Sequence, residues 1–178
     1  MLAPNSSTAC ANVEVASADC RFAAAGFRLI TRDLTSCVAL AVHIPVLEIA
    51  ALLRFSLPDP EICSIEHSKG RWLYGSTAIP LLFSRIEAHG VSREDVSVWA
   101  IGGSDVFSES GIGSQNVRAL RKILRQESIT LQGEDLGGTL VRSLWFNPEG
   151  GRLIVRMRQN PDASAVGESG ASLQTKAS

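Results

Sequence analysis

The sequence predicts an α+β protein in which two helices pack on a mixed sheet system of about six strands. Three observations lead to this fold class. Short apolar stretches bounded by turn residues occupy both halves of the chain, two central segments carry apolar residues at helical spacing, and no repeat of any period is present. The 178 residues, 45% of them hydrophobic, suffice for one domain with a buried core.

The first half of the chain favours strands. Turn-prone residues at Arg32-Asp33 and Pro45 separate three short apolar stretches. A polar segment from Cys63 to Arg71 follows them, and we expect a loop there. The three predicted strands are Phe27 to Thr31, Ser36 to Val42 and Val46 to Phe55.

A first helix is predicted to begin at Thr77, whose hydroxyl can accept a capping hydrogen bond from the first turn. Pro80 then falls within that turn, where its missing N–H is tolerated. One face of the segment is apolar, and Gly90 is expected to end the helix. The apolar face consists of Ala78, Leu82 and Ile86.

A strand and a second helix are predicted next. Val96 to Ile101 alternates in polarity and runs into Gly102-Gly103, which is typical of a strand entering a tight turn. After an exposed loop, Ser114 can cap a helix, and Asn116 is expected to belong to its N-terminus. The outer face is interpreted as solvated surface. The inner stripe is Val117, Leu120 and Leu124, and the outer face is Arg118, Arg121, Lys122 and Arg125.

The C-terminal part again favours strands, the last two joined as a hairpin across residues 147–151. The expected strands are Ile129 to Leu131, Leu140 to Phe146 and Arg152 to Met157. Both ends of the chain are rich in small and polar residues with little periodicity, which predicts loosely held termini. We therefore expect a flexible N-terminal extension over 1–20, one domain over 21–158 and a disordered C-terminal tail over 159–178.

Composition excludes several classes of function. Seventeen basic and 18 acidic residues give a net charge of −1, so no overall basic field favours nucleic acid. The most apolar stretch, Val38 to Leu53, is shorter than the ~20 residues that a membrane-spanning helix needs. Residues 1–20 contain no Lys or Arg, so the basic region of a signal peptide is missing. We expect a cytoplasmic protein that neither binds nucleic acid nor inserts into a membrane.

Cysteine is the residue type that offers chemistry here. Four cysteines without a CxxC pair favour a reducing compartment, and neither a metal site nor a cofactor is expected. Cys37 lies where a polar turn becomes an apolar strand, so its thiol can reach solvent, although a buried, unreactive cysteine is the alternative. A nucleophilic thiol also needs activation, and His43, His67 and His89 are more simply surface or packing residues.

Several motifs follow one another along the chain between about Arg21 and Arg158. They are TRDLTSCV (Thr31–Val38), LLRFSLP (Leu52–Pro58), YGSTAIP (Tyr74–Pro80), WAIGG (Trp99–Gly103), IGSQN (Ile112–Asn116), the segment from Glu134 to Phe146, and the hairpin at Gly150 to Arg152. Several motifs in the same order are more specific than any one of them, and together they resemble those of the CheD family of chemoreceptor glutamine deamidases.

The resemblance implies a layered α/β/β fold and a cysteine-dependent hydrolase. In this family a thiolate attacks the side-chain carboxamide of a receptor glutamine, ammonia leaves, and water releases glutamate from the thioester. The nucleophile maps onto Cys37, an assisting threonine maps onto Thr31, and the family's histidine maps onto Arg54. Methyl-accepting chemotaxis receptors and a CheC-type phosphatase are the partners that the family implies.

Arg54 keeps two hypotheses open. A histidine can take the thiol proton and return one to the departing ammonia, whereas an arginine is always a cation and can only attract the thiolate. The first hypothesis is a glutamine deamidase that uses Cys37, Thr31 and Arg54, with His67 as a histidine that can swing into reach. The second is a weak or inactive CheD-like module that binds receptors or the phosphatase.

Overall fold

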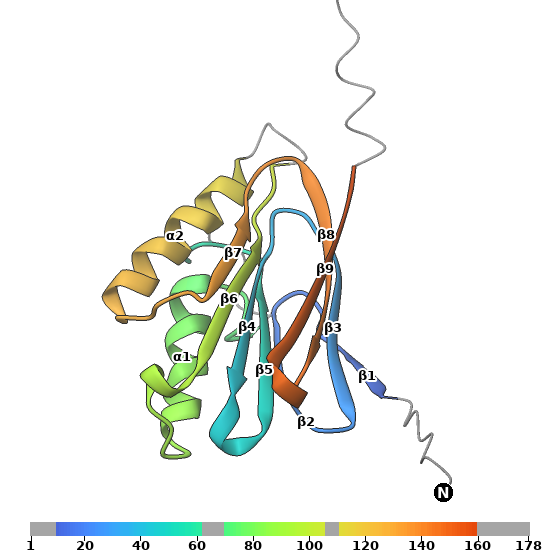
Figure 1. The fold of residues 1–178 in the computed structure, drawn as a ribbon. Coiled ribbons are helices and arrows are strands. Elements are labelled where there is room, and N and C mark those ends of the chain that lie inside the picture. The colour runs from blue at the N-terminus through green and yellow to red at the C-terminus, as the bar shows by residue number, and fades with distance from the viewer. Residues whose placement is uncertain (1–9, 62–69, 106–110, 160–178) are drawn as a thin grey trace, which may run out of the picture.

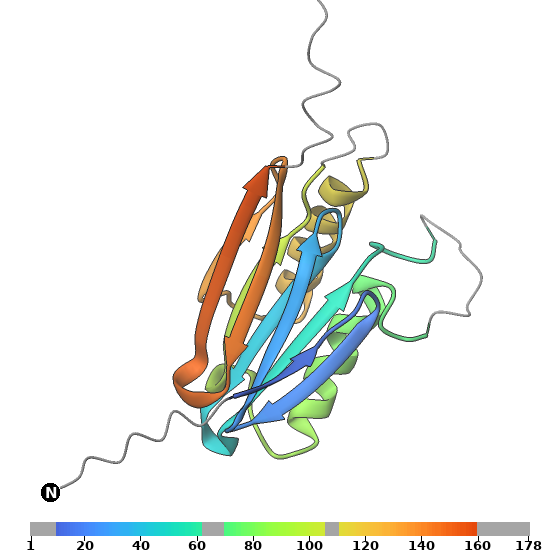
Figure 2. The same cartoon turned by 90° about the vertical axis from the view of Figure 1, so that its right-hand side faces the viewer.

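Two β-sheets stack face to face, and two helices cover the outer face of the larger sheet (Figure 1). The computed structural model describes residues 10–61, 70–105 and 111–159. The smaller sheet has four strands in the order β1-β3-β8-β9, and the larger has five in the order β2-β5-β4-β6-β7. Figure 2 shows the smaller sheet from its open side, with the helices behind the larger sheet. The predicted α+β class and its layering are confirmed.

Neither sheet folds from one continuous segment, because the first three strands alternate between the sheets and the last two strands return to the smaller sheet. The helices are α1 (Gly75–Glu87) and α2 (Ile112–Gln126). The strands are β1 (Ala11–Glu14), β2 (Asp19–Ala24), β3 (Phe27–Leu34), β4 (Val38–Ile44), β5 (Ile49–Phe55), β6 (Ser97–Gly102), β7 (Gly133–Leu136), β8 (Leu140–Asn147) and β9 (Arg152–Gln159).

The central strand β4 separates two hydrophobic cores. Because successive side chains of a strand point to opposite faces, Leu40 and Val42 pack beneath the helices, whereas Ala39 and Ala41 face the smaller sheet. Both faces of β4 are therefore covered, and this explains why the strand reads as a continuous apolar run. The first core also contains Leu82 of α1 and other helix residues, and the second contains Leu29, Leu144 and Phe146.

The helices present the faces that their sequence periodicity predicts. Ala78, Leu82 and Ile86 of α1 are buried, as are Leu120 and Leu124 of α2, whereas Val117 is half-buried. Both helices begin earlier than the expected caps at Thr77 and Ser114. Their caps are Tyr74 and Gly111, and neither makes a side-chain capping hydrogen bond.

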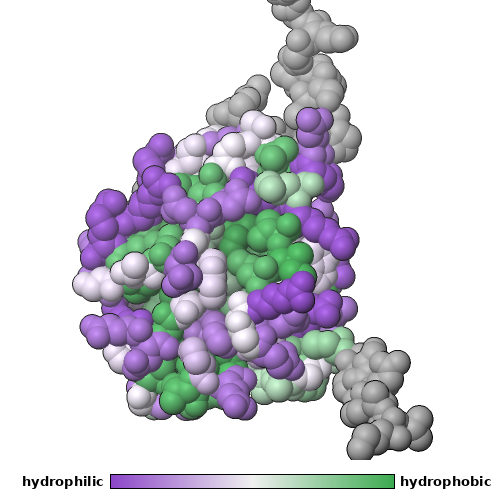
Figure 3. All heavy atoms as spheres, in the orientation of Figure 1, coloured by the Kyte–Doolittle hydropathy of each residue, from purple (hydrophilic) through white to green (hydrophobic). Residues whose placement is uncertain are grey.

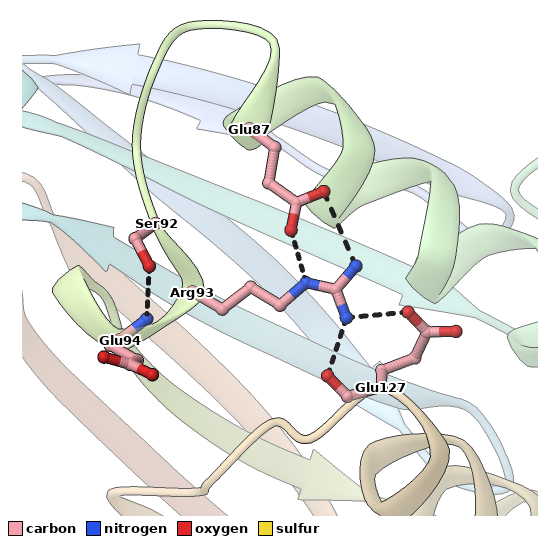
Figure 4. Close-up of polar contacts among 5 residues, drawn as sticks. All are labelled: Glu87, Ser92, Arg93, Glu94 and Glu127. Atoms are coloured by element: carbon pink, nitrogen blue, oxygen red, sulfur yellow. Dashed lines mark hydrogen bonds and ion pairs between the residues drawn. The ribbon is translucent and has the colours of Figure 1, made fainter.

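Arg93 ties the C-terminal ends of the two helices together (Figure 4). Its guanidinium donates to the Glu87 carboxylate at 2.5 Å, to the Glu127 carboxylate at 2.8 Å and to the Glu127 backbone carbonyl at 2.6 Å. Hydrogen bonding to Glu87 raises the pKa of Arg93. Arg93 therefore joins the C-terminal ends of α1 and α2 through its ion pairs with Glu87 and Glu127.

Three further expectations, all about strands and turns, differ from the structure. Residues 11–14 and 19–24, assigned largely to a loose N-terminal extension, are strands, because β1 pairs with β3 and β2 pairs with β5. The expected turn at Arg32-Asp33 is instead a bulge inside β3, where Asp33 has a φ of 53°. Ile129–Leu131 is not a strand, and β7 follows it at Gly133–Leu136. Of the expected tails over 1–20 and 159–178, residues 1–9 and 160–178 lie outside the described residues, and Gln159 ends β9.

Hydrophobic side chains are partly exposed at the open edge of the sandwich, between β6 and β9 (Figure 3). Trp99, Ile101, Leu153 and Val155 line a shallow cavity of about 160 Å³ there. Within the described part of the chain, no helix is both long and apolar enough to cross a membrane.

Candidate active site

Cys37 lies in the connection between β3 and β4, one residue before β4 begins. Backbone hydrogen bonds fix this connection against the end of β6, because Gly103 donates to the Cys37 carbonyl at 2.8 Å and Ser104 donates to the Thr35 carbonyl at 2.8 Å. Gly102 has a φ of +114°, and a Cβ there would lie 2.3 Å from the Cys37 carbonyl oxygen. The Gly-Gly pair therefore permits the close approach that holds the cysteine backbone.

Three polar side chains surround the Cys37 thiol. Its Sγ lies 3.4 Å from Ser56 Oγ, 3.8 Å from Arg54 Nη2 and 4.0 Å from Ser17 Oγ. The two serine hydroxyls also contact each other at 2.5 Å. Cys37 is buried, with 9% of the residue exposed, and it belongs to the second core, so its thiol lies where that core meets these polar side chains. The turn-to-strand boundary predicted a thiol that can reach solvent, with a buried cysteine as the alternative; the structure buries Cys37 and gives its thiol polar neighbours.

Arg54 brings the positive charge to this cluster. It lies near the end of β5, and its Nη1 donates to Thr31 Oγ1 at 3.0 Å and to the Arg32 carbonyl at 2.8 Å. Its Nη2 faces Cys37 Sγ, and its Nε is buried without a hydrogen-bond partner. In the described ranges no carboxylate pairs with Arg54, so the cation faces neutral groups and the sulfur.

Thr31 supports Arg54 and does not touch the thiol directly. The residue is completely buried, and its hydroxyl donates to the Val15 carbonyl at 2.8 Å while accepting from Arg54. Cys37, Arg54 and Thr31, the three residues that the resemblance selects, therefore lie in one chain of contacts. Ser17 and Ser56 were missed by sequence reasoning. Ser56 has a weak signal, because it lies two positions after Arg54 and can share its strand face.

The histidines lie elsewhere in the part of the chain that is described. His43 is half-buried on β4 next to Gly151, and His89 follows α1. His67, which the sequence left as a possible proton carrier, lies outside the described residues. Across the described ranges, no group of three His, Cys, Asp or Glu side chains could hold a metal ion.

Cys20 provides a contrast to Cys37. Burial raises the pKa of the Cys20 thiol to about 12, the nearby Asp19 adds to the effect, and Arg85 opposes it. Such a thiol stays protonated near neutral pH and is a poor nucleophile. Cys37 is therefore the better candidate of the two.

The cluster can stabilise a thiolate and orient it. A guanidinium attracts the negative sulfur, and hydroxyls donate hydrogen bonds to it. None of the side chains that contact Sγ in the described structure exchanges protons near neutral pH. Fold and site together define a class: a layered α+β protein with a candidate cysteine nucleophile at the rim of a sheet.

Sequence comparisons place this class in a family. A family model described as CheD chemotactic sensory transduction matches residues 56–157. A protein of Halalkalibacterium halodurans named chemoreceptor glutamine deamidase CheD is 34% identical over 150 residues, covering 81% of this chain and 92% of that protein. One of the same name from Thermotoga maritima is 34% identical over 130 residues, covering 72% of this chain and 80% of that protein. The chain belongs to the CheD family, as its motifs predicted.

Proposed function

We propose that this chain deamidates glutamine side chains of chemoreceptors and that Cys37 is the nucleophile. The observation that carries the proposal is the contact of Cys37 Sγ with Arg54, Ser56 and Ser17 in a member of this family. The named relatives from two organisms are chemoreceptor glutamine deamidases. These polar neighbours supply what a reactive thiol needs, namely a cation and hydrogen-bond donors.

The reaction has two chemical steps. The Cys37 thiolate attacks the side-chain carbonyl carbon of glutamine, a C–S bond forms, and the C–N bond breaks as ammonia leaves with a proton from solvent. Water then attacks the thioester carbon, the C–S bond breaks, and glutamate and the thiolate are released. The two protons of the water pass to solvent, where one replaces the proton that the departing ammonia took up. The balance is glutamine plus water giving glutamate plus ammonia. No redox partner is needed.

Arg54 and Thr31 divide the supporting work. Arg54 stabilises the thiolate by charge and by an N–H donor, and Thr31 holds the Arg54 guanidinium in place. Since an arginine cannot accept and return a proton, proton transfer to the departing ammonia passes through solvent. General acid–base help is typically worth ~10²–10⁴ in rate, so we expect slow turnover.

The proposal includes where the protein acts. Methyl-accepting chemotaxis receptors are the substrates, and the protein works in the cytoplasm, where thiols stay reduced. A CheC-type phosphatase is a second partner, proposed from the family resemblance.

Ammonia release from a purified receptor cytoplasmic fragment tests the proposal. We expect slow release with the wild-type chain, accompanied by a gain of about one dalton at specific receptor glutamines, and no release with Cys37→Ala. Cys20→Ala is the matched control and should retain activity, because Cys20 lies outside the cluster. Equal release by the wild type and Cys37→Ala would overturn the assignment of the nucleophile.

A second candidate function is a binding module without turnover. Arginine at position 54, where the family resemblance leads us to expect a histidine, favours this candidate. It predicts that the wild type and Cys37→Ala bind the receptor fragment equally and that neither releases ammonia. Ammonia release by the wild type that is lost in Cys37→Ala would exclude this second candidate function.

A further inference from the structure

We propose that Asn116 is a positioning residue that holds Cys37 and Ser56 in contact. As a contribution to catalysis this inference rests on the proposed deamidase function. Asn116 lies early in α2 and is completely buried. The sequence predicted that Asn116 is simply part of the helix N-terminus. The cap of α2 is Gly111, and the Asn116 side chain hydrogen-bonds to residues outside its own helix.

The Asn116 side chain bridges two segments of the candidate site. Its Nδ2 donates to the Ser36 carbonyl at 2.8 Å and to the Ser56 carbonyl at 2.9 Å. Ser36 directly precedes Cys37, and Ser56 carries the hydroxyl closest to the thiol. One amide group therefore fixes the backbone on both sides of the Cys37–Ser56 contact.

This bridge lies just beyond the end of a strand pair. The antiparallel register between β4 and β5 ends with Val38 opposite Phe55, so Cys37 and Ser56 follow the last paired positions. The segment before β4 is held on its other side by Gly103 and Ser104, which donate to Cys37 and Thr35. Asn116 supplies the remaining constraint, between this segment and the end of β5.

An asparagine suits this place for a physical reason. Two carbonyl oxygens require two donors from one short side chain, and a carboxamide nitrogen has two N–H groups. The other carboxamide atom, Oδ1, is buried without a hydrogen-bond partner. An unsatisfied buried acceptor destabilises the fold, whereas leucine would fit an apolar helix face. We take this uncompensated atom as an indication that the bridge serves the site.

The test is a double-mutant cycle on Cys37 alkylation. The rate of iodoacetamide labelling is followed at the Cys37 peptide by mass spectrometry in the wild type, Ser56→Ala, Asn116→Leu and the double variant. Ser56→Ala should slow labelling about fivefold, because a hydroxyl that can donate to the thiolate is lost. In the Asn116→Leu background the same change should alter the rate by less than about twofold, because the contact is already broken.

A matched helix variant and a second substitution keep the test decisive. Lys122→Gln changes an exposed residue of α2 and should preserve the full fivefold effect of Ser56→Ala. If thermal melting reveals that Asn116→Leu does not fold, Asn116→Asp replaces it, since aspartate has the same shape without the donors. Effects of Ser56→Ala and Asn116 substitution that multiply independently would overturn the inference.

Enzyme kinetics separate this inference from the proposed function. Asn116→Leu should lower kcat for ammonia release about tenfold and leave KM within about twofold, as expected for lost alignment of a nucleophile. If the wild type releases no ammonia, the proposed function fails, and the alkylation cycle still decides whether Asn116 holds the contact. An unchanged kcat in an active enzyme would contradict a positioning role.

Discussion

Two arginines lie between the layers of this protein, and their surroundings differ in one respect. Arg142 on β8 makes a bidentate ion pair with Asp135, with N–O distances of 2.9 and 2.7 Å, and also donates to Ser104 Oγ at 2.6 Å. Arg54 on β5 donates to a hydroxyl and a carbonyl and faces the Cys37 sulfur. No carboxylate accompanies Arg54 in the described part of the chain.

The two guanidinium charges therefore have different roles: a carboxylate neutralises the charge of Arg142, and none neutralises that of Arg54 in the described part of the chain. The charge of Arg142 is balanced by Asp135, so the pair joins β8 to β7 across the sandwich. Among the described residues no carboxylate makes an ion pair with Arg54, and a thiolate at Cys37 would place an anion beside its guanidinium. The same residue type thus stabilises the fold at position 142 and, under the proposed function, stabilises a thiolate at position 54.

The largest expected effect is on stability, at Arg142. Arg142→Met should lower the free energy of unfolding by about 2–3 kcal/mol, less than for a fully buried pair because the Asp135 side chain is 37% exposed. Arg54→Met should cost under about 1 kcal/mol, since two hydrogen bonds are lost but an unbalanced charge is removed as well. Urea unfolding of both variants measures the contrast. Equal losses would remove the distinction between the two arginines.

Replacing Arg54 with histidine, which exchanges protons near neutral pH, should raise the rate of ammonia release. Arg54→His is expected to raise kcat for ammonia release at least about tenfold, because an imidazole can return a proton to the departing ammonia. The double variant with Cys37→Ala should be inactive, which confirms that the gain runs through the thiol. A lower kcat than wild type would indicate that the charge of Arg54 matters more than proton transfer.

Thr31 tests how Arg54 is held. Thr31→Val removes the hydroxyl that links Arg54 to the Val15 carbonyl and should slow Cys37 alkylation about threefold. Thr31→Ser keeps the hydroxyl and should alkylate at the wild-type rate. If both variants match the wild type, Thr31 has no part in placing the guanidinium.

Of the expected effects on cysteine labelling, those at Cys20 should be the smallest, and this residue therefore serves as the internal reference. Burial raises its pKa from 9.0 to about 12, so its labelling rate should climb about tenfold per pH unit up to that value. Folding favours the protonated thiol, so this group's contribution to stability is lost as pH rises from about 9 to about 12.

Substitution of Arg54 should leave Cys20 labelling unchanged, as peptide-level mass spectrometry can measure. A parallel change at both cysteines would indicate a general loosening of the fold.

Sequence periodicity predicted the elements that pack against an apolar layer. The buried faces of α1 and α2 and the hairpin of β8 and β9 are confirmed because each has a local pattern. β1 and β2 were missed, since their residues are mostly exposed or half-buried and their pairing partners, β3 and β5, are non-local. β7 was placed too early because Ile129 is buried as part of a loop and not of a strand.

The candidate site was predictable only in part. Cys37 was singled out by its position at the start of an apolar strand, whereas Thr31 and Arg54 were selected only through ordered motifs, since nothing in their local sequence reveals their contacts. Ser17 was not found, because it precedes β2 and reaches the thiol only through the fold. Asn116 was singled out within its motif, but its two carbonyl partners lie 80 and 60 residues away in sequence. Such long-range contacts have no local signal.

The rate of Cys37 alkylation in Arg54→Met, compared with the wild type at neutral pH, tests most directly whether the unbalanced charge of Arg54 serves the thiol. We expect the Cys37 peptide to label about tenfold more slowly in Arg54→Met, while Arg118→Met, which removes an exposed arginine of α2, leaves the rate unchanged. Equal labelling of Cys37 in all three proteins would contradict the claim.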